Sequence, residues 1–234
     1  MLMINNLSGF GASGSSAIPL TSTFLQATSD STDQTTYTFS SVNIGAADAT
    51  RRVVVAFHWS VQNAARTAVS LSIAGVASDL HVQTTTGPTS AQQDCGVLLF
   101  SSLVPTGTSG NIVVTMSGAM GRATIYTYRQ IGGTGTSAFA TMTDNVISGT
   151  TLTGTLNIPT DGTLYAAATS QILSGNTTTW TGITEEYDAP HAEAAGILQS
   201  GGHTSSLTVE TGRTVSSVTN GTSARGSLVA MSWA

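Results

Sequence analysis

Short runs in which apolar and polar residues alternate recur from residue 21 to residue 233 and predict β-strands. The clearest are residues 37–39, 42–44 and 69–73, and Gly75 supplies a turn after the last of them. Alternation places every second side chain on one face of a sheet, so one face can be buried while the other meets water. Many such strands separated by turn residues predict an all-β protein, an antiparallel two-sheet β-sandwich.

Residues 52–60 give the strongest strand signal, and both faces of this strand begin with apolar residues. One face would carry Val53, Val55, Phe57 and Trp59. The other face begins with Val54 and Ala56. Because a strand that is apolar on both faces is covered on both sides, we expect its first half to be central and Trp59 to lie in the core.

The second half of the chain carries the same kind of signal. Its predicted strands are residues 138–141, 152–158, 164–170, 178–183, 207–210, 215–218 and 226–233. Asp161 and Gly162 predict a turn, since both residue types tolerate a positive φ. Residues 188–198 could hold a short helix. In the first half, residues 111–116 and 123–128 are expected to form a hairpin.

The two halves also end alike. Residues 111–126 and residues 214–230 each contain a β-branched run, an element with Gly and Arg, and a second apolar run. This weak repeat fits either two small tandem sandwiches or two interleaved halves of one large sandwich. The glycine-rich break at residues 132–135 is short for an interdomain linker, so we expect interleaved halves and a single domain over residues 21–234.

Residues 1–20 are rich in Gly and Ser and show no alternation, which is typical of a flexible arm. The apolar side chains that could anchor this arm on a neighbour are Leu2, Ile4, Leu7 and Phe10. A frayed terminus explains the same composition. No signal peptide and no membrane-spanning segment is expected, since every apolar run is too short.

The charge content limits the classes of function. Only 8% of the residues are charged, none is lysine, and the net charge is -5. Without a positive field we expect no nucleic-acid partner. Because proton transfer and metal binding need clustered ionisable groups, the composition favours a protein without catalytic residues, cofactor or metal. All seven basic residues are arginines, which we interpret as clamps between strands or at interfaces.

The densest run of ionisable groups is Glu185, Glu186, Tyr187 and Asp188. On a regular strand, Glu185 and Tyr187 would face one way, and Glu186 and Asp188 the other. Two carboxylates on one face could serve a glycosidase, or could bind calcium, which prefers several oxygen ligands. A solvated strand end explains the run without any site, and we favour that interpretation.

Two further residue types are candidates for chemistry. Trp180 lies in a Thr-rich stretch and is the better candidate for an exposed aromatic platform, because Trp59 is predicted to be core. Together with Tyr187 it suggests a protein that binds carbohydrate. Cys95 is the single cysteine, so it forms no disulfide within the chain, and its surroundings predict a packed thiol rather than a nucleophile.

Residues 24–30 (FLQATSD), 37–45 (YTFSSVNIG) and 51–55 (RRVVV) resemble β-sandwich proteins encoded in the structural gene clusters of tailed phages and prophages. The likeness extends loosely to residues 227–233. The resemblance implies a jelly-roll-like sandwich that assembles as a homo-oligomer in a virion, as a capsid decoration, a head spike or a tail component. It carries no functional residues over to this chain.

The leading hypothesis is therefore a non-enzymatic virion subunit, made in the cytoplasm of a bacterial host, that docks on capsid or tail proteins through residues 1–20. One alternative is a carbohydrate-binding module that recognises a host surface glycan through Trp180 and Tyr187. Another is a glycosidase that uses Glu185, Glu186 or Asp188.

Overall fold

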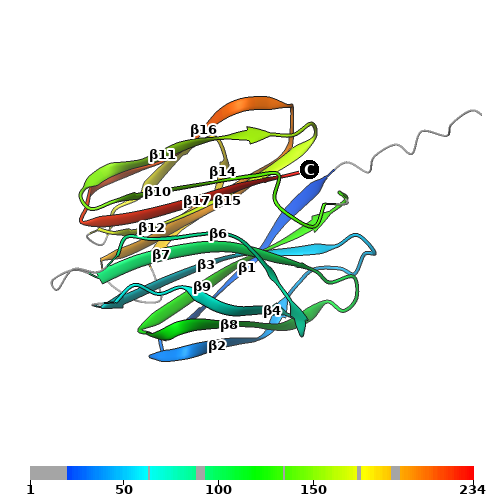
Figure 1. The fold of residues 1–234 in the computed structure, drawn as a ribbon, viewed down its shortest axis with the longest axis horizontal. Helices are drawn as coiled ribbons and strands as arrows, with labels where there is room; N and C mark the ends of the chain where they lie inside the picture. The colour runs from blue at the N-terminus through cyan, green and yellow to red at the C-terminus, as the bar shows by residue number, and fades with distance from the viewer. Residues whose placement is uncertain (1–19, 63, 88–92, 134, 173–174, 191–195) are drawn as a thin grey trace, which may run out of the picture.

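The computed structural model describes residues 20–62, 64–87, 93–133, 135–172, 175–190 and 196–234. Within these ranges the chain forms four antiparallel β-sheets and no helix. The sheets are stacked as four layers (Figure 1). Two layers come from the first half of the chain, here called the first unit, and two from the second half, the second unit.

The first unit has an inner sheet of five strands and an outer sheet of four. The inner sheet runs in the order β1 (Thr21–Asp30), β9 (Arg122–Ile131), β3 (Arg52–Gln62), β7 (Gln93–Leu103) and β6 (Asp79–Thr85). The outer sheet runs in the order β2 (Gln34–Asn43), β8 (Ser109–Met120), β4 (Ala68–Ile73) and β5 (Val76–Ala77). The first strand of the unit pairs with the last, the second with the last but one, and β3 with β7.

The second unit repeats this arrangement. Its inner sheet runs in the order β10 (Ala140–Val146), β17 (Arg225–Trp233), β12 (Gly162–Gln171), β15 (Ile197–Leu207) and β14 (Thr184–Pro190). Its outer sheet runs in the order β11 (Gly149–Ile158), β16 (Glu210–Ser223) and β13 (Thr178–Thr181). Strand for strand, β10 corresponds to β1, β17 to β9 and β12 to β3. The weak sequence repeat falls on matching strands, β8 with β9 and β16 with β17.

The two inner sheets face each other, and their strand orders run in opposite directions across the interface. The central strands β3 and β12 are in contact, while β6 lies against β10 and β17, and β1 lies against β15. A hydrogen bond between His58 and Thr169 joins corresponding ends of β3 and β12. Equivalent ends of the two units therefore lie at the same edge of the molecule (Figure 1).

Three apolar layers separate the four sheets. The layer inside the first unit contains Tyr37, Phe57 and Trp59, the layer between the inner sheets contains Tyr128, Tyr165 and Trp233, and the layer inside the second unit contains Leu152, Leu164 and Val215. Both inner sheets are thus covered on both faces. Every residue of β17 is buried, as are residues 52–61 of β3.

The structure confirms several expectations. The antiparallel β-sandwich class, the covered strand at residues 52–60 and the core position of Trp59 are all found. The turn at Asp161 is confirmed by its φ of 54° and by a hydrogen bond from Gly162 N to Pro159 O of 3.1 Å.

Two expectations are wrong, and a third falls mainly outside the described residues. The two halves do not interleave, because no sheet among the described residues contains strands of both units. The hairpin at residues 111–128 is not formed, because β8 and β9 belong to different sheets that enclose the same core. Residues 188–190 end β14, Gly196 lies in a turn and residues 197–198 begin β15, while residues 191–195, where most of the expected helix would fall, lie outside the described ranges.

Arg51 is an example of the expected arginine clamps. Its side chain is fully buried, and Nε donates to Val104 O at 2.6 Å. The two terminal nitrogens donate to the carbonyl oxygens of Gly45, Thr106 and Gly107. One planar guanidinium therefore fixes two connections of the first unit at once.

Gly96 allows β7 to pass directly over the indole ring of Trp59. A Cβ at this position would lie 2.6 Å from Trp59 Nε1 and closer still to two ring carbons. Trp59 is fully buried between the sheets of the first unit, so the ring has no room to move away. At Gly121, by contrast, an added Cβ would meet only Ser60 O at 4.0 Å.

Replacement of Arg51 by lysine should lower the free energy of unfolding by about 3 kcal/mol, because a compact ammonium group cannot reach four carbonyl oxygens. Urea unfolding measures the effect. Arg213→Lys is the matched control, since Arg213 forms a partly exposed pair with Glu210 and its replacement should cost about 1 kcal/mol or less. Equal stability of the two variants would contradict the clamp.

The variant Gly96→Ala should be less stable than the wild type by roughly 1–3 kcal/mol, the cost of overfilling a packed core. Gly121→Ala introduces the same methyl group into open space and should stay close to the wild type. Thermal unfolding compares them, and the near-ultraviolet circular dichroism of Trp59 should change only for Gly96→Ala. An unchanged melting temperature for that variant would be inconsistent with the close approach.

Candidate functional site

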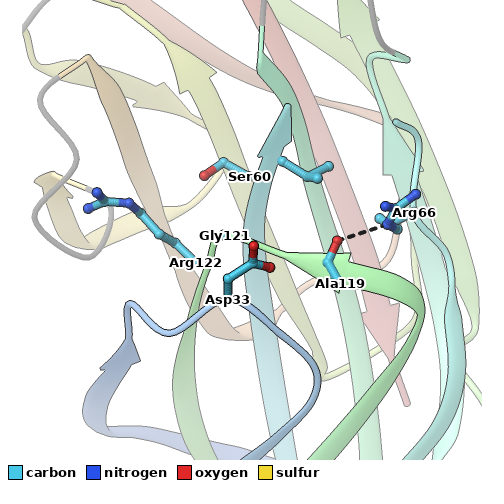
Figure 2. A pocket seen from close by; sticks show the side chains of 7 residues that line it. Asp33, Ser60, Arg66, Ala119, Gly121 and Arg122 are labelled. Atoms are coloured by element: carbon cyan, nitrogen blue, oxygen red, sulfur yellow. Dashed lines mark hydrogen bonds between the residues drawn. The ribbon is translucent and has the colours of Figure 1, made fainter. Parts of the chain in front are cut away.

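A polar pocket opens at one end of the first unit, with a volume of about 470 Å³ (Figure 2). It is lined by Asp33, Ser60, Val61, Arg66, Ala119, Gly121 and Arg122. The volume lies within the range of roughly 300–1,000 Å³ that is usual for ligand pockets.

The pocket residues come from separate segments of the chain that meet where strands of the two sheets end. Asp33 lies in the connection between β1 and β2, and Arg66 in the connection between β3 and β4. Ser60 lies near the end of β3, directly opposite Arg122 at the start of β9. Figure 2 shows Asp33 between the two arginine side chains.

Arg66 is held in place by the backbone. Its Nε donates to Ala119 O at 3.0 Å, and NH1 donates to Ala65 O at 3.3 Å. The guanidinium lies against Gly118, where a Cβ would come within 2.8 Å of Nε and 2.9 Å of Cζ. The second terminal nitrogen, NH2, has no protein acceptor in the part of the chain that the structure describes. The pocket therefore presents a pre-positioned donor.

A smaller hollow of about 180 Å³ lies at the corresponding end of the second unit. Its lining includes Asn176 and Thr177 after β12, Asp188 in β14, and Ile197 in β15. The two hollows occur at matching ends of two units with the same strand order. The same edge of the molecule thus carries both hollows.

The predicted acidic site is divided by a bulge in β14. Glu185 lies opposite Gly202 and Tyr187 opposite Gly201, so Glu186 is the extra residue. Glu186 accepts a hydrogen bond of 2.8 Å from His203 Nδ1, and Asp188 accepts one of 2.8 Å from Thr178 N. The expected sharing of one strand face by Glu186 and Asp188 is not found.

Glu185 and Asp188 are the carboxylates of this segment whose proton affinity is altered. Burial raises the pKa of Glu185, and the charge of Asp188 adds to the effect. Burial also raises the pKa of Asp188, while hydrogen bonds from Thr178 oppose the rise. Of the predicted acidic residues, Asp188 lines the smaller of the two hollows described above and the others line neither, so these hollows do not bring the predicted residues together.

The two predicted aromatic platforms are not open to a ligand in the way the sequence suggests. Trp180 is half-buried against the core of the second unit, and its Nε1 donates to Ser200 Oγ at 2.6 Å. Tyr187 is 8% exposed and stacks on Tyr126 of the first unit, with 3.4 Å between ring centroids.

Tyr187 belongs to a hydrogen-bonded chain that crosses the interface between the units. Its hydroxyl lies 2.9 Å from His58 Nε2, and His58 Nδ1 lies 2.7 Å from Thr169 Oγ1. Thr169 Oγ1 donates to Gly96 O at 3.2 Å. Because the Thr169 hydroxyl donates to Gly96 O, it can accept from His58 Nδ1. His58 of the first unit is thereby linked to Thr169 and Tyr187, both of the second unit.

Of the remaining residues singled out from the sequence, Cys95 is buried and the four apolar residues of the N-terminal segment are not described. Leu2, Ile4, Leu7 and Phe10 lie outside the described residues. Cys95 is a buried free thiol, as expected, and burial raises its pKa. Within the described ranges, no three His, Cys, Asp or Glu side chains gather closely enough to hold a metal ion. Over the same part of the chain, no helix could span a membrane.

Sequence reasoning does not find the pocket of the first unit. Asp33 lies in a stretch typical of an ordinary turn, and the sequence identifies Arg66 and Arg122 only as members of a set of clamps. The three residues are far apart in the sequence and follow no motif. One feature of the sequence could have directed attention to Arg122. It follows Gly121 in the Gly and Arg element that separates the two apolar runs of the weak repeat.

No family model, no curated protein and no solved structure matches the chain. Its function is therefore inferred from the geometry of the described residues.

His81 gives the contact between the units a dependence on pH. It packs edge-on against Trp233 of the second unit at 4.9 Å and lies 2.7 Å from Ser101 Oγ through Nε2. Burial lowers its pKa from 6.5 to about 4, and the charge of Arg52 contributes. Protons therefore bind the unfolded chain more readily than the folded one between these two values.

Stability should be fully present above pH 6.5 and should fall as the pH is lowered towards about 4. The variant His81→Gln keeps a polar side chain without a titrating ring, so its loss of stability over this range should be smaller. Urea unfolding at several pH values measures both proteins. Because His203 is present in both, the difference between the curves reports His81, and identical curves would refute its role.

Proposed function

We propose that the chain is a non-enzymatic structural subunit of a tailed-phage particle, a capsid decoration, head spike or tail component, that docks through its N-terminal segment. The observation that carries the proposal is that the two ends of the molecule differ: the N-terminal segment enters the fold at one end, and the two pockets lie at the other. Leu20, the first described residue, lies beside the C-terminal Ala234, because a Cβ on Gly133 would approach Leu20 Cδ1 at 3.0 Å and Ala234 O at 2.7 Å. The strand ends whose residues line the two pockets lie at the opposite edge of the fold (Figure 1).

We extend the proposal to the finer fold, in which each unit is a jelly roll. In both units the first strand pairs with the last, the second with the last but one, and the third with its counterpart across the unit. This is the pairing that results when a long antiparallel ribbon is wrapped around a core. The phage-particle proteins that the sequence resembles imply the same architecture.

The surface supports an assembly role in a homo-oligomer. Large apolar side chains that are at least 38% exposed are spread over both units: Val69, Val76, Leu80, Leu103, Phe139, Ile147, Val209 and Val218. A surface with few charges and no lysine offers little electrostatic repulsion to a second copy. Neighbouring subunits would cover some of these residues.

The same geometry gives little support to a glycosidase. The carboxylate of Glu186 is paired with His203. The carboxylate of Asp188 accepts a hydrogen bond from Thr178 N, and Asp188 lines a hollow of only about 180 Å³. The carbohydrate-binding alternative through Trp180 and Tyr187 is also weakly supported, because Tyr187 is buried between the units and Trp180 is half-buried against the core of the second unit.

Deletion of residues 1–19 from the gene in the producing genome tests the docking role. The truncated chain keeps Leu20, which is 3% exposed, so its melting temperature should stay at the wild-type value. Its amount in purified particles, measured by mass spectrometry, should fall by about tenfold or more, as expected when anchoring residues are lost.

A second variant separates anchoring from chain length. Replacement of Leu2, Ile4, Leu7 and Phe10 by serine keeps the segment but removes its apolar contacts, and it should reproduce the loss. Full incorporation of either variant would disprove docking by the arm. Absence of the wild-type chain from particles would disprove the virion assignment itself.

A further inference from the structure

We infer that the folded end of the molecule from which the N-terminal segment leaves is itself a docking surface, and that its partner is an apolar surface with a basic rim on another virion protein. The inference deepens the proposed function and rests on it, because it extends docking from the segment to the folded chain. Its basis is a group of four exposed apolar side chains, here called the end patch: Val76, Leu80, Leu103 and Phe139.

The two leucines of the end patch are connected through the buried ring of Trp233. This ring packs against His81, which follows Leu80 in the chain, with 4.9 Å between ring centroids. Arg52 lies 4.6 Å above the same ring and is the direct partner of Leu103 across β3 and β7. Both leucines of the first unit therefore reach Trp233 of the second unit through their immediate neighbours.

The other two members of the end patch adjoin the same surface. The backbone nitrogen of Phe139 donates to the carbonyl oxygen of the residue before Trp233 at 2.8 Å. Val76 lies in β5, and the carbonyl of the next residue accepts a hydrogen bond of 3.2 Å from the side chain of the residue before Leu103. The end patch is therefore one connected group that spans both units. Apolar side chains that gather in this way mark interaction sites, whereas scattered ones do not.

The N-terminal segment leaves the fold beside the end patch. A Cβ on Gly133 would approach both Leu20 and Ala234, and a Cβ on Gly135 would lie 3.7 Å from Ala234 O and 3.6 Å from Trp233 Nε1. Figure 1 shows the start of β1 close to the C-terminus. Since residues 1–19 continue from this point, a protein that binds them lies against the end patch as well.

Two other exposed apolar residues lie away from this surface and provide controls. Ile147 follows the last residue of β10, whereas Phe139 precedes the first. The two are 65% and 55% exposed, so they differ in place more than in exposure. Val218 lies within the outer sheet of the second unit, between Thr151 and Thr179.

The charges near the end patch describe the partner. Arg52 is 6% exposed and lies over Trp233, so it offers little charge to a neighbour. Asp79 is exposed and directly precedes Leu80, so its carboxylate favours a basic group at the rim of the opposite surface. A symmetric contact between two copies would bring two such carboxylates to one interface, where like charges repel. These groups favour a different virion protein over a second copy.

Particle incorporation tests the end patch while the N-terminal segment stays intact. The triple variant Leu80→Ser, Leu103→Ser and Phe139→Ser removes apolar contacts and should lower the amount of the chain in purified particles about tenfold or more. Mass spectrometry measures the amount. The matched control, Ile147→Ser with Val218→Ser, removes exposed apolar side chains elsewhere and should be incorporated as the wild type is.

A second variant blocks the surface without removing any packing. Thr136 is exposed and lies in the connection that leads to Phe139. The variant Thr136→Arg places a charge that neither an apolar surface nor a basic rim accepts, and it should lower incorporation about tenfold. The variant Thr150→Arg adds the same charge at an exposed position near Ile147 and should have no effect. Both arginine variants should keep the melting temperature of the wild type.

Normal incorporation of Thr136→Arg or of a folded triple variant overturns the inference, and so does an equal loss in the controls. If these variants are incorporated normally while deletion of residues 1–19 removes the chain from particles, the segment docks alone and the proposed function stands. Absence of the wild-type chain from particles refutes both. Light scattering of the purified chain identifies the other occupant: a lower mass for the triple variant together with normal incorporation would show that the end patch joins copies of this chain.

Discussion

The structure depends on one constraint: the two inner sheets are covered on both faces, so polar side chains at their shared interface have no water to bind. Several of these groups are paired across the interface. His58 connects Tyr187 of the second unit to Thr169, and Gln199 donates to Thr124 at 3.1 Å. Buried polar groups are costly unless paired, so these contacts fix one relative position of the units. The shared edge with its two recesses follows from that position.

Ionisable side chains at the interface also contact partners on both units. His203 faces the carboxylate of Glu186 through Nδ1 and the carbonyl of Ser22 through Nε2 at 3.1 Å. Glu186 belongs to the second unit and Ser22 to the first, so this imidazole joins the two units. Arg52 lies 4.6 Å above the Trp233 ring, where a cation is attracted by the aromatic face. Ionisable groups are few in this chain, and several of them serve to join its halves.

The alternation of apolar and polar residues predicts those features in which one face of a strand is apolar and buried. It identifies the sandwich class, the covered strand at residues 52–60 and the buried Trp59. It fails where the buried surface is polar, because the interface between the inner sheets uses Tyr, His, Thr and Ser, which are also typical of a solvent-exposed face. For this reason the pattern does not reveal that Tyr187 is buried at the interface. The bulge at Glu186 and the meeting of Asp33 with Arg66 depend on backbone geometry and tertiary contacts, which no local pattern encodes.

The reversed strand orders across the interface are those of an approximate twofold axis parallel to the strands, with β3 and β12 closest to it. Separate subunits related in this way would form an isologous dimer that dissociates on dilution. Here residues 132–139 connect the halves, so association is intramolecular and independent of protein concentration. Because the two units are parts of one chain, matching positions need not carry the same residue, and the two recesses at the shared edge can differ.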